Sequence, residues 1–166
     1  MTPPLPTIFS GNIVVVDSMV IINFHNLLKL DKLVNIWAKK EIVITPIIRE
    51  EAIYSNNGRI DLSLYISNGS ILEENLGEEE KNLFFNYCAN GIAEKLIHEG
   101  EAACLALAIS KGYGLASDEK IIREEFKKIC PDKICVNSWN IVKITRQRNL
   151  IGEKETRDLS LGLYYS

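Results

Sequence analysis

Four acidic residues lie far apart in the sequence but occupy similar local settings. Asp17 directly follows the β-branched run IVVV, and Asp118 follows the short apolar segment YGLAS. Glu101 stands near the start of the segment EGEAACLALAISKG, and Glu51 lies within the segment TPIIREEAI. Carboxylates that converge repel one another, so their charge must be compensated by protons, basic side chains or a cation. Oxygen ligands suit Mg²⁺ or Mn²⁺, and such ions activate water for attack on a phosphodiester.

The elements predicted around these acids alternate as in an α/β domain with a parallel sheet. Short β-branched runs predict strands at Asn12–Val16, Glu41–Thr45, 70–75, 113–117 and 134–138. The longer segments predict helices from 18 to about 28, and at Asp31–Lys39, 46–53, 77–91, 99–112, 119–129 and 139–150. The segment DLSLYIS fits either a helix or a strand. Ligand sites in parallel sheets form outside the carboxyl ends of the strands, so the four acids are expected to meet in one cleft.

Two of the acids have capping as an alternative role. Asp17 could cap the helix that follows it, but Ser18 could do this instead and leave Asp17 free for a metal. The Ser18 hydroxyl could also contact a phosphate or a metal-bound water. Asp118 could cap the helix after it, with Lys120 as a nearby counter-charge. Capping and metal binding are compatible at Asp118, and the sequence leaves both readings open.

The two glutamates also have simpler explanations. Glu50 and Glu51 form an ambiguous pair, of which the spacing from Pro46 favours Glu51 as the residue that faces the cleft. Thr45 is predicted as the N-cap of their helix, with Pro46 at the first helical position. Glu101 could merely complement the helix dipole, which is worth up to about 1 kcal/mol at an exposed site. Glu99 shares that ambiguity.

Composition narrows the class of protein. The chain has 166 residues with a formal net charge of -3, so it has no overall electrostatic attraction to nucleic acid or to an anionic membrane. It contains no long apolar run, no linker and no internal repeat. We therefore expect one domain over residues 1–166, with an irregular segment at 1–11, and no membrane association. Without a recognisable signal peptide, the cytoplasm is the expected compartment.

The ordered set of motifs resembles the PIN-domain nucleases. The matching pieces are VVVDSM, ITPIIREEAI, GEAACLALAISKG and LASDEK, in the order and on the elements that the family uses. The resemblance extends from about Ile13 to Leu150. It implies a PIN-like three-layer α/β/α sandwich with a central, mainly parallel sheet. Two positions depart from the usual pattern: Glu101 stands where VapC-like members commonly have Asp, and Ala116 where a Thr is frequent.

What the resemblance implies about activity is more specific. Asp17, Glu51, Glu101 and Asp118 would bind Mg²⁺ or Mn²⁺, and metal-activated water would cleave RNA to leave 5′-phosphate and 3′-hydroxyl ends. Ser117 would support the site, as Ser18 would. Many small members of the family are toxins, so an antitoxin protein and a second copy of the chain are candidate partners. Some members have lost activity, and the alternative is an inactive module that binds RNA or a protein.

Basic residues are candidates for holding the phosphate backbone of such an RNA. One group lies along the last predicted helix, and two further cations lie beside predicted acids. These candidates are Lys143, Arg146, Arg148, Arg49 and Lys120. For the group at 143–148, a solvated helix face is the slightly favoured interpretation. Arg49 fits equally well as a phosphate contact or as a counter-ion of the Glu50–Glu51 pair.

Overall fold

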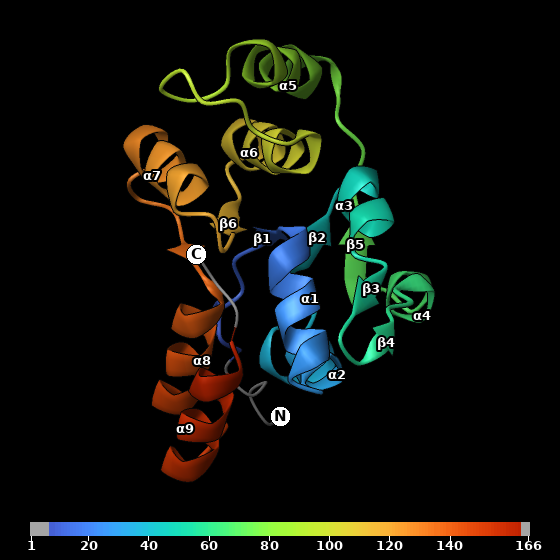
Figure 1. Ribbon diagram of the computed structural model, residues 1–166, viewed down its shortest axis with the longest axis vertical. Coiled ribbons are helices and arrows are strands. Elements are labelled where there is room, and N and C mark those ends of the chain that lie inside the picture. Colours follow the sequence, from blue (N-terminus) through green and yellow to red (C-terminus); the bar gives the residue numbers. More distant parts are fainter. Residues whose placement is uncertain (1–6, 164–166) are drawn as a thin grey trace, which may run out of the picture.

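A five-stranded parallel sheet lies between two layers of helices in the computed structural model, which describes residues 7–163 (Figure 1). The strand order is β5-β2-β1-β6-β7, and every neighbouring pair is parallel. The strands are β1 (Val14–Val16), β2 (Ile42–Ile44), β5 (Ile71–Glu73), β6 (Gly114–Ala116) and β7 (Cys135–Val136). The three central strands are buried throughout, as expected for a sheet covered on both faces. The predicted α/β/α sandwich is confirmed.

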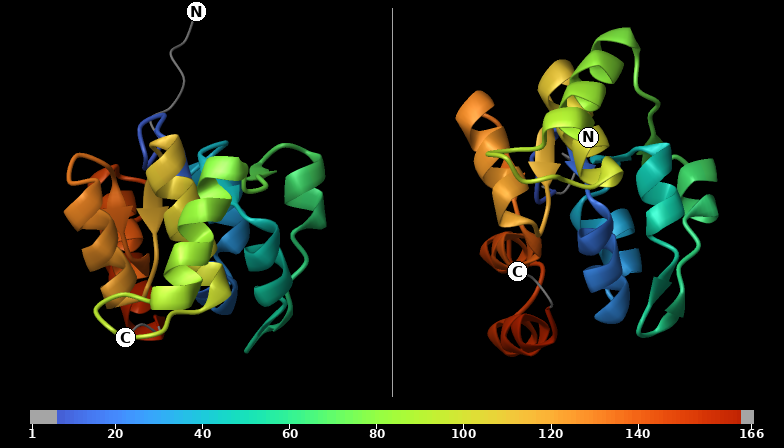
Figure 2. Two further views of the ribbon diagram at one scale, coloured as in Figure 1. Left: turned by 90° about the horizontal axis from the view of Figure 1, so that it is seen from above. Right: turned by 45° about the horizontal axis from the view of Figure 1, so that its top comes forward.

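The helices form one layer on each side of the sheet, which two further views also show (Figure 2). One layer holds α5 (Glu78–Asn90), α6 (Glu99–Lys111) and α7 (Lys120–Ile129). The other holds α1 (Ser18–Asn26), α2 (Leu30–Lys32), the π-helix η1 (Leu33–Trp37), α8 (Ser138–Gln147) and α9 (Glu153–Gly162). Near β5 lie α3 (Pro46–Glu51), α4 (Ser63–Ser67) and a hairpin of β3 (Tyr54–Ser55) and β4 (Gly58–Arg59). No helix within residues 7–163 is long and apolar enough to cross a bilayer.

Helix α6 positions part of the candidate site because its own sequence keeps it close to the sheet. Its buried residues run without a break from Ala102 to Ala108 and have no measurable exposure. Alanines at four of these seven positions allow the helix to approach β1 and β6 closely while Leu105 and Leu107 fill the core. The first turn of α6 is thereby fixed at the carboxyl edge of the strands.

Three details differ from the sequence-based expectations. The predicted helix Asp31–Lys39 contains a π-helix, in which the Ala38 amide bonds to the Leu33 carbonyl. The wider turn changes the helical phase, and Ile36 is 54% exposed whereas Leu33 and Trp37 are buried. The open segment DLSLYIS forms α4. Helix α9 was not predicted, since Leu159 is its one buried residue and it shows no apolar period.

The N-terminal segment contains no helix or strand over its described residues 7–11, whereas residues 1–6 lie outside the described range. It is nevertheless fixed to the domain by Glu41, a 3% exposed carboxylate just before β2. Glu41 accepts hydrogen bonds from the Thr7 hydroxyl at 2.5 Å, the Gly11 amide at 2.5 Å and the Phe9 amide at 3.3 Å. These bonds hold the buried Phe9 side chain against the core.

Replacing Glu41 with alanine should lower the free energy of unfolding by about 2–4 kcal/mol. The substitution leaves the amides of Phe9 and Gly11 without their carboxylate acceptor, and a buried unsatisfied group costs about 1–3 kcal/mol. Urea unfolding followed by circular dichroism measures this difference. Exchange of Glu153, an exposed acid at the start of α9, for alanine is the control. A Glu41 variant as stable as this control would show that the hydrogen bonds of Glu41 do not stabilise the fold.

Candidate active site at the carboxyl edge of the sheet

Asp17 lies at the end of β1 and is 3% exposed. It is the N-cap residue of α1, and its Oδ1 accepts a hydrogen bond from the Ser18 amide at 2.7 Å. Its Oδ2 accepts one from the Ser117 hydroxyl at 3.2 Å. Burial raises the pKa of Asp17 from 3.8 to about 7, against the lowering effect of the Ser18 amide, and the charge of Glu101 raises it further. The residue therefore both caps the helix and carries an unusual proton affinity.

Glu51 reaches the same region from the end of α3. The helix begins as the sequence predicts, with the Thr45 hydroxyl accepting from the Ile48 amide and Pro46 at the first position. The Glu51 carboxyl group lies directly against Gly100, the second residue of α6. A Cβ at position 100 would be 2.7 Å from the carboxyl carbon of Glu51, so a larger residue there would displace the flexible end of the Glu51 side chain. The charge of Glu51 raises the pKa of both Asp17 and Glu101.

Glu101 lies in the first turn of α6 and is partly buried. Burial and the charge of Glu119 raise its pKa, whereas the charge and the backbone amide of His98 lower it. His98 is the N-cap of α6, so the Glu101 carboxylate also serves the helix terminus. The structural role considered from the sequence and a place beside the other acids therefore coexist in this residue.

Asp118 follows β6 at the same edge but is held by protein donors. Its Oδ1 accepts from the Ser138 amide at 2.7 Å, and its Oδ2 accepts from the Ser138 hydroxyl and the Asn23 side-chain amide, both at 2.6 Å. The residue is 2% exposed. It does not cap α7, whose N-cap is Glu119, but joins the start of α8 to α1.

The structure thus brings three of the predicted acids, Asp17, Glu51 and Glu101, near one another: the charges of Glu101 and Glu51 raise the pKa of Asp17, and the charge of Glu51 raises the pKa of Glu101. Among residues 7–163, no lysine or arginine forms an ion pair with any of them. Their oxygens are the donors that Mg²⁺ or Mn²⁺ prefers, and a cation would offset their mutual repulsion. In the same part of the chain, no three acidic, histidine or cysteine side chains are already arranged to enclose an ion. Metal binding therefore requires these side chains to move together.

The other predicted residues lie in different places. Ser117 is fully buried, and besides bonding Asp17 its hydroxyl accepts from the Glu119 amide at 3.2 Å. Arg49 donates to Glu73 at 3.3 Å and to Ser63 at 3.1 Å. Lys120 is exposed at the start of α7, where its ammonium lies 3.8 Å from the Glu124 carboxylate.

The basic group on α8 lies away from the acids. Arg148 donates to the Ser10 hydroxyl at 2.5 Å, and Ser10 precedes the amino end of β1, whereas Asp17 follows its carboxyl end. The Lys143 ammonium lies 5.7 Å from the centre of the Trp139 ring. Arg146 is exposed on the last turn of the helix. The carboxyl end of α8 is thus directed to the edge of the sheet opposite the candidate site.

Sequence reasoning did not identify four residues that surround the acids. Glu119 affects Glu101, and its position next to Asp118 was the available signal. Asn23 and Ser138 bind Asp118 from distant segments, and nothing local marks them. Cys104 is fully buried; burial, followed by the nearby acids, raises the pKa of its thiol, which keeps it protonated.

Comparison with known proteins agrees with this geometry. A family model described as a PIN domain (DUF3368) matches residues 13–129, well over half of the chain. The matched range includes the four predicted acids and all strands of the sheet except β7. Searches of curated proteins and of solved structures found no match. PIN domains are generally nucleases and typically use divalent metals. The chain therefore belongs to the PIN-domain family.

Proposed function

We propose that this chain is a metal-dependent endoribonuclease that hydrolyses RNA phosphodiester bonds, and that it is of the toxin type found in toxin–antitoxin pairs. The observation that carries the proposal is the set of three carboxylates from three separate elements. Burial and the charges of Glu101 and Glu51 raise the pKa of Asp17, and among residues 7–163 none of the three acids forms an ion pair with a lysine or an arginine. An uncompensated group of this kind is typical of a cation site rather than of a structural ion-pair network.

The three carboxylates would hold the metal ion, and each comes from a different element. The Ser18 amide and the Ser117 hydroxyl orient Asp17, and the His98 amide orients Glu101, whereas the Glu51 carboxyl group occupies the space that Gly100 leaves open. A bound Mg²⁺ or Mn²⁺ would lower the pKa of a water molecule and stabilise charge on the phosphate. Asp118 would hold α1 and α8 in place behind the site, and any contact with the ion would come in addition to its three hydrogen bonds.

A second candidate, an inactive module that binds RNA, is favoured by one observation. Within residues 7–163 no ready-made group of metal-binding side chains is present. Both candidates bind RNA, but only the enzyme needs the acids to bind an ion and to cleave.

The test is a cleavage assay with the full chain, a labelled single-stranded RNA, and Mn²⁺ or a chelator. Two matched pairs of variants separate site acids from their neighbours: Glu101→Gln with Glu99→Gln, and Glu51→Gln with Glu50→Gln. We expect the first member of each pair to lose activity on the order of 100-fold, and the second to retain it, because only the first lies by the site. Calorimetric titration with Mn²⁺ should show the same division.

The competing outcomes are distinct. If the wild-type chain neither cleaves RNA nor binds Mn²⁺ but still binds RNA, the inactive module replaces the enzyme. If both members of a pair lose activity equally, the assignment of the ligands is wrong.

A further inference from the structure

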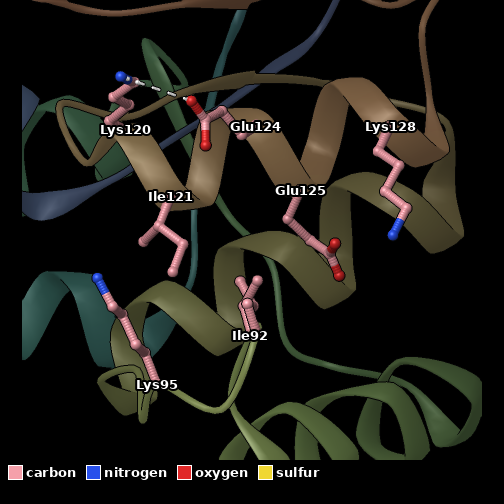
Figure 3. Close-up of a pocket in the computed structure, with 8 residues that line it drawn as sticks. Ile92, Lys95, Lys120, Ile121, Glu124, Glu125 and Lys128 are labelled. Atoms are coloured by element: carbon pink, nitrogen blue, oxygen red, sulfur yellow. Dashed lines mark ion pairs between the residues drawn. The ribbon is translucent and has the colours of Figure 1, made fainter.

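An open pocket of about 530 Å³ lies beside the candidate site, between α7 and the turn that joins α5 to α6 (Figure 3). Ile92 and Lys95 line it from the turn, and Lys120, Ile121 and Lys128 line it from α7. Figure 3 shows the two isoleucines facing each other across the pocket. Its floor is therefore apolar, and basic side chains stand around its rim.

The turn that carries Lys95 is tightly constrained. The amide of each of Ile92 and Lys95 donates to the carbonyl of the other, at 2.9 and 3.0 Å. Between them Ala93 and Glu94 have φ of 50° and 66°, values that a side chain disfavours and that hairpin turns normally fill with Asn-Gly. A Cβ on Gly91 would lie 2.6 Å from the Lys95 carbonyl carbon, so the turn also closes tightly on the end of α5. Strain of this kind is often kept where a side chain must be presented.

The charges around the pocket favour an anionic occupant. Among residues 7–163, neither Lys95 nor Lys128 forms an ion pair. Of the two acids in the lining, Glu125 accepts from the Tyr87 hydroxyl at 2.9 Å, and the Glu124 carboxylate lies 3.8 Å from the Lys120 ammonium in an exposed pair of little strength. Three lysines and two glutamates leave the lining with one net positive charge. Lys120 and Lys128 are eight positions apart on α7, which is about 12 Å along the helix axis.

The pocket is connected to the candidate site through neighbouring residues of the chain, although Asp17, Glu51 and Glu101 do not line it. Lys120 directly follows Glu119, whose carboxylate acts on Glu101, and the Ile92–Lys95 turn leads directly into α6. A chain bound along α7 would therefore arrive at the acids.

We propose that this pocket holds the sugar–phosphate backbone of the single-stranded RNA substrate, with Lys95, Lys120 and Lys128 on its phosphates. The proposal rests on the proposed function, because it specifies how the substrate of that site is held. None of the described residues that line the pocket is aromatic, so it offers no surface on which bases could stack. Binding here should thus depend on salt and hardly on sequence.

The experiment measures binding of fluorescein-labelled oligouridine to the full chain by fluorescence anisotropy, with a chelator present so that no cleavage occurs. The test variant is Lys95→Ala with Lys128→Ala. The matched control is Lys143→Ala with Arg146→Ala, which removes the same charge from α8. For single strands, each lost phosphate contact lowers the slope of log affinity against log salt by about 0.7. We expect the test variant to lose about 1.4 from this slope and about tenfold in affinity, and the control to change less than about twofold.

A third variant tests the opposite direction. Glu124→Gln releases Lys120 and should strengthen RNA binding by about two- to threefold, since it removes a carboxylate from the path of the phosphates. Equal losses in the test and control variants, or an unchanged salt slope, would overturn the proposal. So would an effect on the binding of oligoglutamate that is absent for RNA, which would show a site for an acidic peptide. Failure of Mn²⁺-dependent cleavage with lysine-dependent RNA binding intact would refute the enzymatic function and leave the pocket standing.

Discussion

Replacing Asp17 with asparagine should abolish RNA cleavage and, above pH 7, make the folded chain more stable. Burial raises the pKa of Asp17 from 3.8 to about 7, so the folded protein keeps this proton between about pH 4 and pH 7 while the unfolded chain has lost it. The stability that protonation contributes is complete below the unfolded pKa and is lost as the pH rises through the folded one. Asparagine cannot ionise and avoids this loss.

The expected gain is about 2–3 kcal/mol above pH 7. A tenfold change in proton affinity corresponds to about 1.4 kcal/mol, which sets a ceiling of about 4 kcal/mol. Part of this gain in stability is lost because the substitution removes the charged acceptor of two hydrogen bonds. The asparagine oxygen can still accept from the Ser18 amide, and its NH₂ group can donate to the Ser117 hydroxyl.

Urea unfolding of both proteins across this pH range measures the effect, with the exposed Asp132→Asn as control. The stability difference should grow from pH 4 to pH 7 and then level off. Mn²⁺ should stabilise the wild type and leave the Asp17 variant unchanged, because an ion that binds only the folded state adds to its stability. A variant that is less stable than the wild type above pH 7, or a difference that ignores pH, would contradict this account of the site.

Replacing Asp118 with alanine should have the opposite effect and lower the free energy of unfolding by about 3–5 kcal/mol. The substitution removes the acceptor of three buried hydrogen bonds and leaves Ser138 and Asn23 facing an empty space. Removing one partner from a buried charged network costs this much because the remaining polar groups stay desolvated. Asp17 and Asp118 thus lie at the same edge but should differ in the sign of their effect on stability.

The same unfolding measurement tests this prediction, with Ser138→Ala for comparison. That variant loses only the hydroxyl and keeps the amide bond to Asp118, so we expect a loss of about 1–1.5 kcal/mol. The double variant should lose clearly less than the sum of the two single losses, because both remove the same bond. Strict additivity, or an Asp118 variant that unfolds like the wild type, would show that the network contributes little.

The sequence was sufficient to predict the fold and the PIN family, and it predicts that the four acids meet at the carboxyl edge of the sheet. Because β1 and β6 are adjacent and parallel, Asp17 and Ser117 come together after these strands, whereas the approach of Glu51 to Gly100 was not predicted. The partners of Asp118 were not predictable, because Asn23 is 95 residues away and no local pattern connects the two. Distant hydrogen bonds of this kind depend on how α1 and α8 pack, which periodicity does not report.

The details that escaped prediction have a similar origin. The exposure of Ile36 results from a single widened helical turn, which no residue type in the sequence indicates. Helix α9 is attached to the domain by the buried Leu159 side chain and by an ion pair of 2.6 Å between Lys29 and Glu155. Both depend on tertiary context. Lys95 and Lys128 line the same pocket only because a turn and a helix face each other in the folded chain, which the sequence does not show.

The strand order also determines when the candidate site can form during synthesis. Ser117, which orients Asp17, stands 100 residues after it in the chain, and β6 must insert beside β1 before the two can meet. A ribosome-bound chain that ends before α6 would carry Asp17 and Glu51 without Glu101, and one edge of β1 would still be open. If the chain cleaves RNA as proposed, it would therefore not do so before Ser117 had emerged from the ribosome.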